Sequence, residues 1–204
     1  MLRLIASLLF LSCAGAAHAI ATDPAPGGAY KTDPSHSSLV WSLNHSGLSR
    51  YTARFTGVYA RLDWKPEKPE QSALTVTIDP LSVRTDFPWA EMGDFDAEIG
   101  GGENFLDAQP MTFVSQSIRV TGPNTGVVEG LLTILGQTHP ARLDVTFNGS
   151  MAEHPMMGVA KIGFSATGVI RRSDWGLDYG IPELGDEVTF SVETQMVPAD
   201  FVFP

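Results

Sequence analysis

The sequence of 204 residues is poor in cysteine and in basic side chains. Cys13 is its single cysteine, and 13 Lys and Arg residues face 23 Asp and Glu residues, for a formal net charge of −10. Nucleic-acid phosphates and anionic membrane surfaces require a basic face, so this balance argues against both as partners. A disulfide framework and a metal site built on several thiolates are excluded as well.

The chain also lacks a long apolar run and the common catalytic motifs. After residue 20 no apolar stretch approaches the roughly 20 residues of a membrane-spanning helix, so we expect no membrane span. There is no GxSxG, HExxH, phosphate-loop or dinucleotide-binding motif. Asp94, Asp96 and Glu98 have no base or nucleophile motif beside them. We therefore predict neither an enzyme nor a cofactor.

The first residues have the parts of a secretory signal peptide. Arg3 supplies the positive start, residues 4–10 begin the apolar stretch, and Ala17-His18-Ala19 has the form of a cleavage site. We predict that residues 1–19 are cleaved after Ala19 and that the protein is exported. An uncleaved anchor and a lipoprotein attached through Cys13 are the alternatives.

Residues 20–29 are rich in Pro, Gly and Ala, and we predict a flexible leader there. Residues 30–204 then form one domain in which alternating apolar and polar residues predict eight strands. Gly57 is the expected bend in the longest of them. The predicted strands are 37–45, 50–63, 72–79, 111–120, 126–135, 138–149, 159–171 and 187–197.

One segment departs from this alternation. Between Asp86 and Ile99, apolar residues recur at every third or fourth position. Asp86 suits the position before a helix, Pro88 suits its first turn, and the glycines at 100–102 would end it. We predict one amphipathic helix here, packed against the sheet.

Antiparallel strands at this spacing form a sandwich or a barrel. Apolar residues that face inward occur on nearly every predicted strand. A barrel of eight strands holds either its own side chains or one small ligand. The pattern alone leaves a filled and a hollow interior open.

Five segments, in order along the chain, resemble the YceI-like family. They are Tyr30–His45 with its Asp33-Pro34 and His36-Ser37 pairs, Phe55-Thr56-Gly57, Asn104–Phe113, Val128–Thr138 and Arg172-Ser173-Asp174-Trp175-Gly176. The resemblance extends over residues 30–197. It implies an all-β, eight-stranded antiparallel lipocalin-like barrel in the bacterial periplasm. The family is variable where this chain has its predicted amphipathic helix, which we expect at or near the mouth of the barrel.

The same resemblance implies a binding or carrier protein, monomeric or homodimeric. The barrel would enclose the apolar tail of a polyisoprenoid or a related long-chain amphiphile, namely a quinone, a fatty acid or a fatty amide. The candidate ligand-binding residues are Leu39, Trp41, Leu43, Phe55, Leu74, Val76, Phe113, Leu132, Phe147, Phe164, Phe190, Trp89, Met92 and Arg172.

Two other functions remain open from the sequence. One is an envelope-stress or interaction module without an obligatory ligand. The other is a lipid-modifying enzyme, for which the chain offers only scattered titratable candidates. These are Tyr51, Tyr59, His36, His45 and Arg172.

Three polar residues have two interpretations each. His36 and His45 are an odd number of positions apart on one predicted strand and so lie on opposite faces. We predict no metal site there and a structural role for both, with a pH-responsive role as the alternative. Arg172, with Asp174, either grips a polar head group or fixes a local turn.

Overall fold

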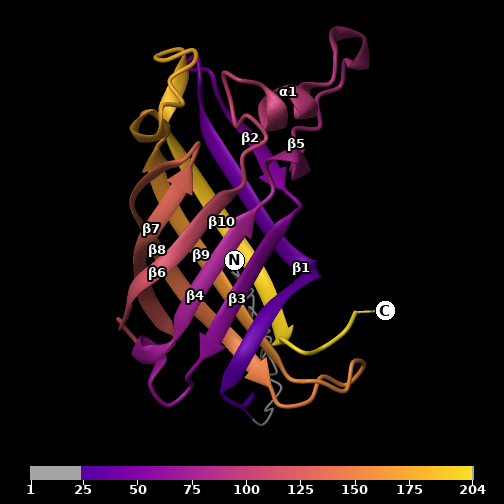
Figure 1. The fold of residues 1–204 in the computed structure, drawn as a ribbon, viewed down its shortest axis with the longest axis vertical. Coiled ribbons are helices and arrows are strands. Elements are labelled where there is room, and N and C mark those ends of the chain that lie inside the picture. The colour runs from indigo at the N-terminus through magenta and orange to yellow at the C-terminus, as the bar shows by residue number, and fades with distance from the viewer. Residues whose placement is uncertain (1–23, 204) are drawn as a thin grey trace, which may run out of the picture.

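Ten strands form one antiparallel sheet in the computed structural model, which describes residues 24–203 (Figure 1). Their order is β10-β9-β8-β7-β6-β4-β3-β1-β2-β5, and β10 also pairs with β1. The strands are β1 Gly28–His45, β2 Ser49–Phe55, β3 Val58–Trp64, β4 Ala73–Ile78, β5 Val83–Arg84, β6 Met111–Val120, β7 Thr125–Ile134, β8 Gln137–Met151, β9 Lys161–Arg171 and β10 Leu184–Pro198.

The β10–β1 pairing closes the sheet into a barrel. Its wall consists of β1, β3, β4 and β6 to β10, while β2 and β5 extend β1 on one side. This confirms the predicted eight-stranded antiparallel barrel. Each of these eight strands is paired with a wall strand on both sides, so none of them is an edge strand of an open sheet.

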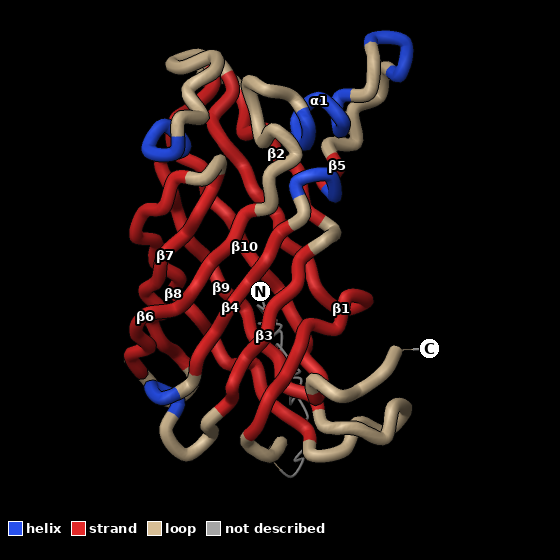
Figure 2. Tube along the Cα trace, in the orientation of Figure 1, coloured by secondary structure: helices blue, strands red, loops and turns tan. Residues whose placement is uncertain are grey.

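Helical segments gather mainly at one end, which we call the mouth end (Figure 2). The α-helix α1, Phe95–Gly101, lies there together with the connection between β9 and β10 (Figure 1). We call the opposite end, where the chain enters β1, the base. The short 3-10 helices are η1 Pro69–Gln71, η2 Pro80–Ser82, η3 Ala90–Met92 and η4 Arg172–Trp175.

β1 bends sharply in its middle and thereby pairs with two different strands, one in each half (Figure 1). Residues 28–31 pair with β3, whereas residues 39–45 pair with β2. Both parts pair with β10, but the register shifts between Thr32 and Ser37. This bulge turns the strand without breaking the closed wall.

A buried ion pair holds the bulge. The Asp33 side chain is fully buried, and its Oδ2 lies 2.7 Å from Nζ of Lys161 on β9. Lys161 also donates to Oε1 of Gln195 on β10 at 3.0 Å. The hydroxyl of Ser35 donates to Oδ1 of Asp33, and Nδ1 of His36 lies 2.9 Å from its Oδ2. The cluster joins β1, β9 and β10, and His36 has the structural role predicted for it.

Hydrogen bonding keeps Asp33 ionised. Burial raises the pKa of its carboxyl, but the hydrogen bonds from Lys161, Ser35 and His36 outweigh burial. The pKa of Asp33 is therefore held well below its usual range.

The helix differs from its prediction. It begins at Phe95, and the side chain of Asp94 caps it by accepting from the backbone N–H of Ala97 at 3.0 Å. Asp86 cannot cap a helix because its φ of 56° places it in the left-handed region, where it pairs with Arg54 instead. Gly100 was expected to end the helix but lies within it. A glycine suits this position because α1 packs so closely on η2 that a side chain there would collide with Pro80.

Two strand predictions also change. The predicted strand 50–63 is two strands, β2 and β3, that separate next to the expected bend at Gly57. The predicted strand 37–45 begins at Gly28 instead. Ala25 is buried and its N–H donates to the Ser150 hydroxyl, so the described part of the predicted leader packs on the barrel. The predicted signal peptide, 1–19, and residues 20–23 lie outside the described residues.

We expect Lys161→Met to lower the free energy of unfolding by about 3–5 kcal/mol, because it leaves the Asp33 carboxylate buried without its counter-ion. Chemical denaturation followed by tryptophan fluorescence measures this. Lys65→Met is the control, since Lys65 pairs with Asp63 at 3.0 Å but both side chains are about half exposed. Its effect should stay below about 1 kcal/mol. Equal stability of Lys161→Met and the unaltered protein would contradict the role of this pair.

The same carboxyl predicts an acid dependence of stability. Its folded pKa lies below the unfolded value of about 3.9, so ionised Asp33 stabilises the fold above about pH 4. That contribution is lost as the pH falls from there towards the folded pKa. The stability difference between the unaltered protein and Asp33→Asn should therefore narrow below about pH 4. Denaturant titrations at several pH values test this, and a difference that widens in acid would oppose it.

Candidate functional site

The mouth half of the barrel is hollow. A cavity of about 360 Å³ lies there, and apolar side chains from the wall strands and from α1 make up most of its lining. The apolar lining residues are Leu39, Trp41, Leu43, Phe55, Val76, Ile78, Phe95, Ile99, Phe105, Leu106, Met111, Phe113, Leu132, Ile134, Ala141, Leu143, Ile170, Leu177, Leu184, Val188, Phe190 and Val192.

Two glycines help to keep this half open. A side chain on Gly130 of β7 would collide with the ring of Phe113 on β6. A side chain on Gly168 of β9 would likewise collide with the ring of Phe190 on β10. Each ring thus lies against the backbone of the neighbouring strand. This arrangement places the bulk of the two phenylalanines along the wall rather than across the lumen.

The polar lining residues come from elements at the mouth end. They are His45, Tyr51, Glu98, Asn104, Arg172 and Tyr179. The cavity thus combines an apolar interior with a polar opening. Such a site suits an amphiphilic molecule, whose tail leaves water while its head stays near the opening.

Two polar atoms in the cavity wall are buried without a hydrogen-bond partner among the described residues. They are Nε1 of Trp41 and the hydroxyl of Tyr51, whose rings lie 6.0 Å apart. Burial raises the pKa of Tyr51, so its hydroxyl stays protonated near neutral pH. A buried donor without an acceptor costs about 1–3 kcal/mol.

Arg172 braces the mouth. Its guanidinium donates to the carbonyl oxygens of Leu177, Leu184 and Gly185 at 2.5–2.9 Å. Burial lowers the pKa of the Arg172 guanidinium, and the nearby Asp186 carboxylate opposes this shift. The side chain therefore fixes the connection between β9 and β10 while it also lines the cavity.

The rest of the Arg172–Gly176 motif anchors this connection. Trp175 is buried, and its Nε1 donates to the carbonyl oxygen of Leu132 on β7 at 3.1 Å. Gly176 follows with a φ of 77°, which a residue with a side chain rarely adopts. Asp174 is exposed, and the described partners of Arg172 are backbone carbonyls rather than this carboxylate.

Most predicted site residues lie around one space. Those that line the cavity are Leu39, Trp41, Leu43, Phe55, Val76, Phe113, Leu132, Phe190 and Arg172. Trp89 and Met92 do not line it and are 54% and 73% exposed. The reason is that the helix begins only at Phe95, which does reach the cavity.

Leu74, Phe147 and Phe164 do not line the cavity. Trp64 stacks on Phe147 with ring centroids 5.6 Å apart and meets Phe164 edge-on at 5.5 Å. Phe147 and Phe164 are themselves 5.4 Å apart. Trp64 belongs to a second buried cluster, and the partly buried Phe147 and Phe164 pack against it. Leu74 packs against both this cluster and the one around the cavity.

Sequence reasoning missed the lining residues that come from connections between strands. Leu106, Leu177 and Tyr179 have no periodic neighbours that would indicate which way they face. Leu106 could have been identified from the sequence in another way, because it lies in the Asn104–Phe113 segment that carried the family resemblance.

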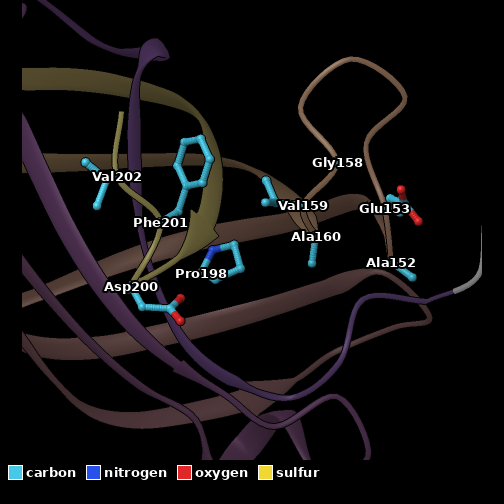
Figure 3. Close-up of a pocket in the computed structure, with 9 residues that line it drawn as sticks. All are labelled: Ala152, Glu153, Gly158, Val159, Ala160, Pro198, Asp200, Phe201 and Val202. Atoms are coloured by element: carbon cyan, nitrogen blue, oxygen red, sulfur yellow. The ribbon is translucent and has the colours of Figure 1, made fainter. Parts of the chain in front are cut away.

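A second hollow, of about 570 Å³, lies on the surface at the base (Figure 3). It lies between the β8–β9 connection and the residues after β10, where Glu153, Val159 and Phe201 are among its lining. Acidic Glu153 and Asp200 border it, and Val202 is largely exposed. We take the more enclosed apolar cavity as the candidate site.

Neither a metal centre nor a membrane span is found in the part of the chain that the structure describes. Within residues 24–203, no three His, Cys, Asp or Glu side chains are grouped as a metal site requires. None of the helices in that range is both long and apolar enough to cross a bilayer.

A family model and a curated relative each match most of the chain. Residues 30–196 match the family described as the YceI-like domain. A UPF0312 protein of Pseudomonas putida is 31% identical over 153 residues, which cover 72% of this chain and 76% of the relative.

Two solved structures share the fold. The Campylobacter jejuni YceI protein has a TM-score of 0.64 at 28% identity, covering 74% of this chain and 86% of its own. A polyisoprenoid-binding domain from Saccharophagus degradans has a TM-score of 0.53 at 14% identity, covering 83% and 98%. At that identity, the second likeness shows the fold alone.

We expect Arg172→Met to loosen the mouth, because three carbonyl oxygens lose their charged donor. Backbone amides in residues 177–185 should exchange hydrogen faster by at least about tenfold, while β6 to β8 stay protected. Mass-spectrometric hydrogen exchange measures both. The neighbouring Arg171→Met is the control, since Arg171 is exposed and pairs with Asp186. Unchanged exchange in Arg172→Met would contradict the bracing role.

Proposed function

The chain belongs to the YceI-like family, and from this membership we propose that it is a binding protein for a long-chain amphiphile. The mouth half of the barrel would enclose the apolar tail of a polyisoprenoid, a quinone, a fatty acid or a fatty amide. The observation that carries the proposal is the apolar cavity of about 360 Å³, which opens among polar side chains at the mouth. The polyisoprenoid-binding domain of Saccharophagus degradans supports it as a protein of the same fold.

The energetics suit a carrier. Each buried methylene stabilises a complex by about 0.8 kcal/mol, and the ordering of tail and side chains offsets part of that gain. A cavity that buries a limited length of tail therefore gives moderate affinity. Moderate affinity allows release as well as capture.

The polar side chains at the opening favour a tail that ends in a polar group. His45, Asn104 and Tyr179 line the cavity there and could donate to a carbonyl, carboxylate or quinone oxygen. Arg172 adds positive charge at the same end of the cavity. An amphiphile of the proposed classes meets both requirements, whereas a plain hydrocarbon does not.

The scattered titratable residues do not favour a lipid-modifying enzyme. His36 contacts Asp33 at the β1 bulge, and Tyr59 is 59% exposed on β3, so neither lines the cavity. His45, Tyr51 and Arg172 do line it, but Arg172 is engaged by loop carbonyls. A ligand-free module is disfavoured for a different reason, because a filled barrel would need no cavity of this size.

We further propose that the protein acts in the periplasm after removal of residues 1–19. The signal-peptide pattern of the sequence is the support for this location.

Protein purified from the envelope of its native host should carry an amphiphile that organic solvent extracts and mass spectrometry identifies. Val188→Trp should lose most of it, because Val188 lines the cavity and the larger ring would fill the lumen. Val169→Trp is the matched control, since Val169 is 54% exposed on β9. Circular dichroism checks that both variants fold.

If the purified protein repeatedly carries no amphiphile and binds no added prenol, quinone or fatty acid, the proposal is wrong. Equal loading of the two tryptophan variants would place the binding site outside this cavity.

A further inference from the structure

Negative charge is concentrated at the mouth end of the barrel. Residues 85–110, which run from β5 through α1 to β6, contain seven Asp or Glu residues and neither Lys nor Arg. Residues 172–183, between β9 and β10, contain three more acidic residues together with Arg172. Both segments reach the same end of the barrel (Figure 1). A head group at the opening therefore enters a negative electrostatic field.

The base has no such excess of acidic residues. The connections there are 65–72, 121–124 and 152–160, and together they contain three Asp or Glu residues and two Lys residues. The charge asymmetry is therefore a property of the end at which the cavity opens.

Glu98 brings this charge into the lining of the cavity. It lies on α1, three residues after Phe95 and one before Ile99, and all three line the cavity. This spacing places them on one face of the helix. Phe95 and Ile99 supply apolar contact, whereas the Glu98 side chain is exposed. Within residues 24–203, no basic side chain forms an ion pair with Glu98.

Arg172 also lines the cavity but does not cancel this charge. It is buried, and its guanidinium donates to three carbonyl oxygens of the connection between β9 and β10. The carboxylates of Asp186 and Asp178 both favour its charged form. The positive charge of Arg172 is thus offset within the protein, whereas the negative charge of Glu98 is not.

Two aromatic rings in the lining favour a cation as well. Phe105 and Tyr179 both line the cavity, and their ring centroids are 5.3 Å apart at an interplanar angle of 61°. The Tyr179 side chain is about half exposed, so one part of it remains accessible to a ligand. The face of an aromatic ring attracts a cation through its quadrupole and repels a carboxylate. Phe105 and Tyr179 therefore favour the same sign of head group as Glu98.

We propose that Glu98 makes the cavity selective for the charge of the head group. An ammonium head binds most tightly, an uncharged head less tightly, and a carboxylate or phosphate head least tightly. The ligand class is therefore long-chain amines and uncharged amphiphiles, rather than fatty acids or prenyl phosphates. This inference rests on the proposed function, because it specifies the head group of the molecule that the same cavity takes.

Three ligands with the same tail isolate the effect of the head group: dodecylamine, dodecanamide and dodecanoic acid. Near neutral pH the first is cationic, the second is uncharged and the third is anionic. Calorimetry at low ionic strength measures their affinities. The amine should bind at least about tenfold more tightly than the acid, with the amide between them. Added salt should reduce the ratio of amine to acid affinity, because it screens the charges at the opening.

Glu98→Gln should weaken binding of the amine and strengthen binding of the acid, so that the ratio falls at least about threefold. Glu98→Lys should change the ratio further in the same direction. The matched control is Glu70→Gln, since Glu70 is an exposed glutamate on η1 at the base, and the ratio should stay as in the unaltered protein. Circular dichroism checks that all three variants fold.

The outcomes separate the two proposals. If the acid binds as tightly as the amine, or if Glu98→Gln leaves the ratio unchanged, the charge selectivity is overturned and the proposed function stands. A ratio that falls equally in Glu70→Gln also overturns it, because the net charge of the protein would then set the preference. Absence of binding for all three ligands, and for prenols and quinones as well, overturns the proposed function and the selectivity with it.

Discussion

Closure of β1 onto β10 is the constraint on which the rest of the structure depends. The wall has to close around a lumen, yet β1 pairs with β3 near the base and with β2 near the mouth. The bulge after Thr32 makes this change of neighbour feasible, and the buried pair of Asp33 and Lys161 holds it. We infer that this buried charge pair helps to specify the register of β1, because Lys161 on β9 contacts both Asp33 on β1 and Gln195 on β10.

Within this wall, one alternating pattern produces two different interiors. Towards the mouth, Phe113 and Phe190 lie over glycines on neighbouring strands and leave the centre open. Towards the base, Phe147 and Phe164 lie opposite each other on β8 and β9, and the ring of Trp64 on β3 packs against both. The two halves thus contain rings of similar size but differ in what each ring faces. Towards the mouth a ring faces a glycine, and towards the base it faces another ring.

Much of this was predictable. Strand periodicity located the wall, and Leu39, Trp41 and Leu43 do face the cavity. The helix was placed too early because the spacing of Trp89 and Met92 satisfied a helical period over a segment that η3 and turns occupy. Asp86 satisfied a capping pattern, but its backbone took the left-handed conformation and its carboxylate paired with Arg54.

By itself, the sequence determined the class of fold, the set of inward-facing apolar residues and the resemblance that indicates a lipid-binding family. Only the tertiary structure decided which of those residues line a space and which fill one. The physical reason is that alternation along a strand reports a face, whereas a cavity depends on distances between strands far apart in sequence. Phe147 and Phe190 have the same local pattern, and only their partners on the neighbouring strand, Phe164 and Gly168, distinguish them.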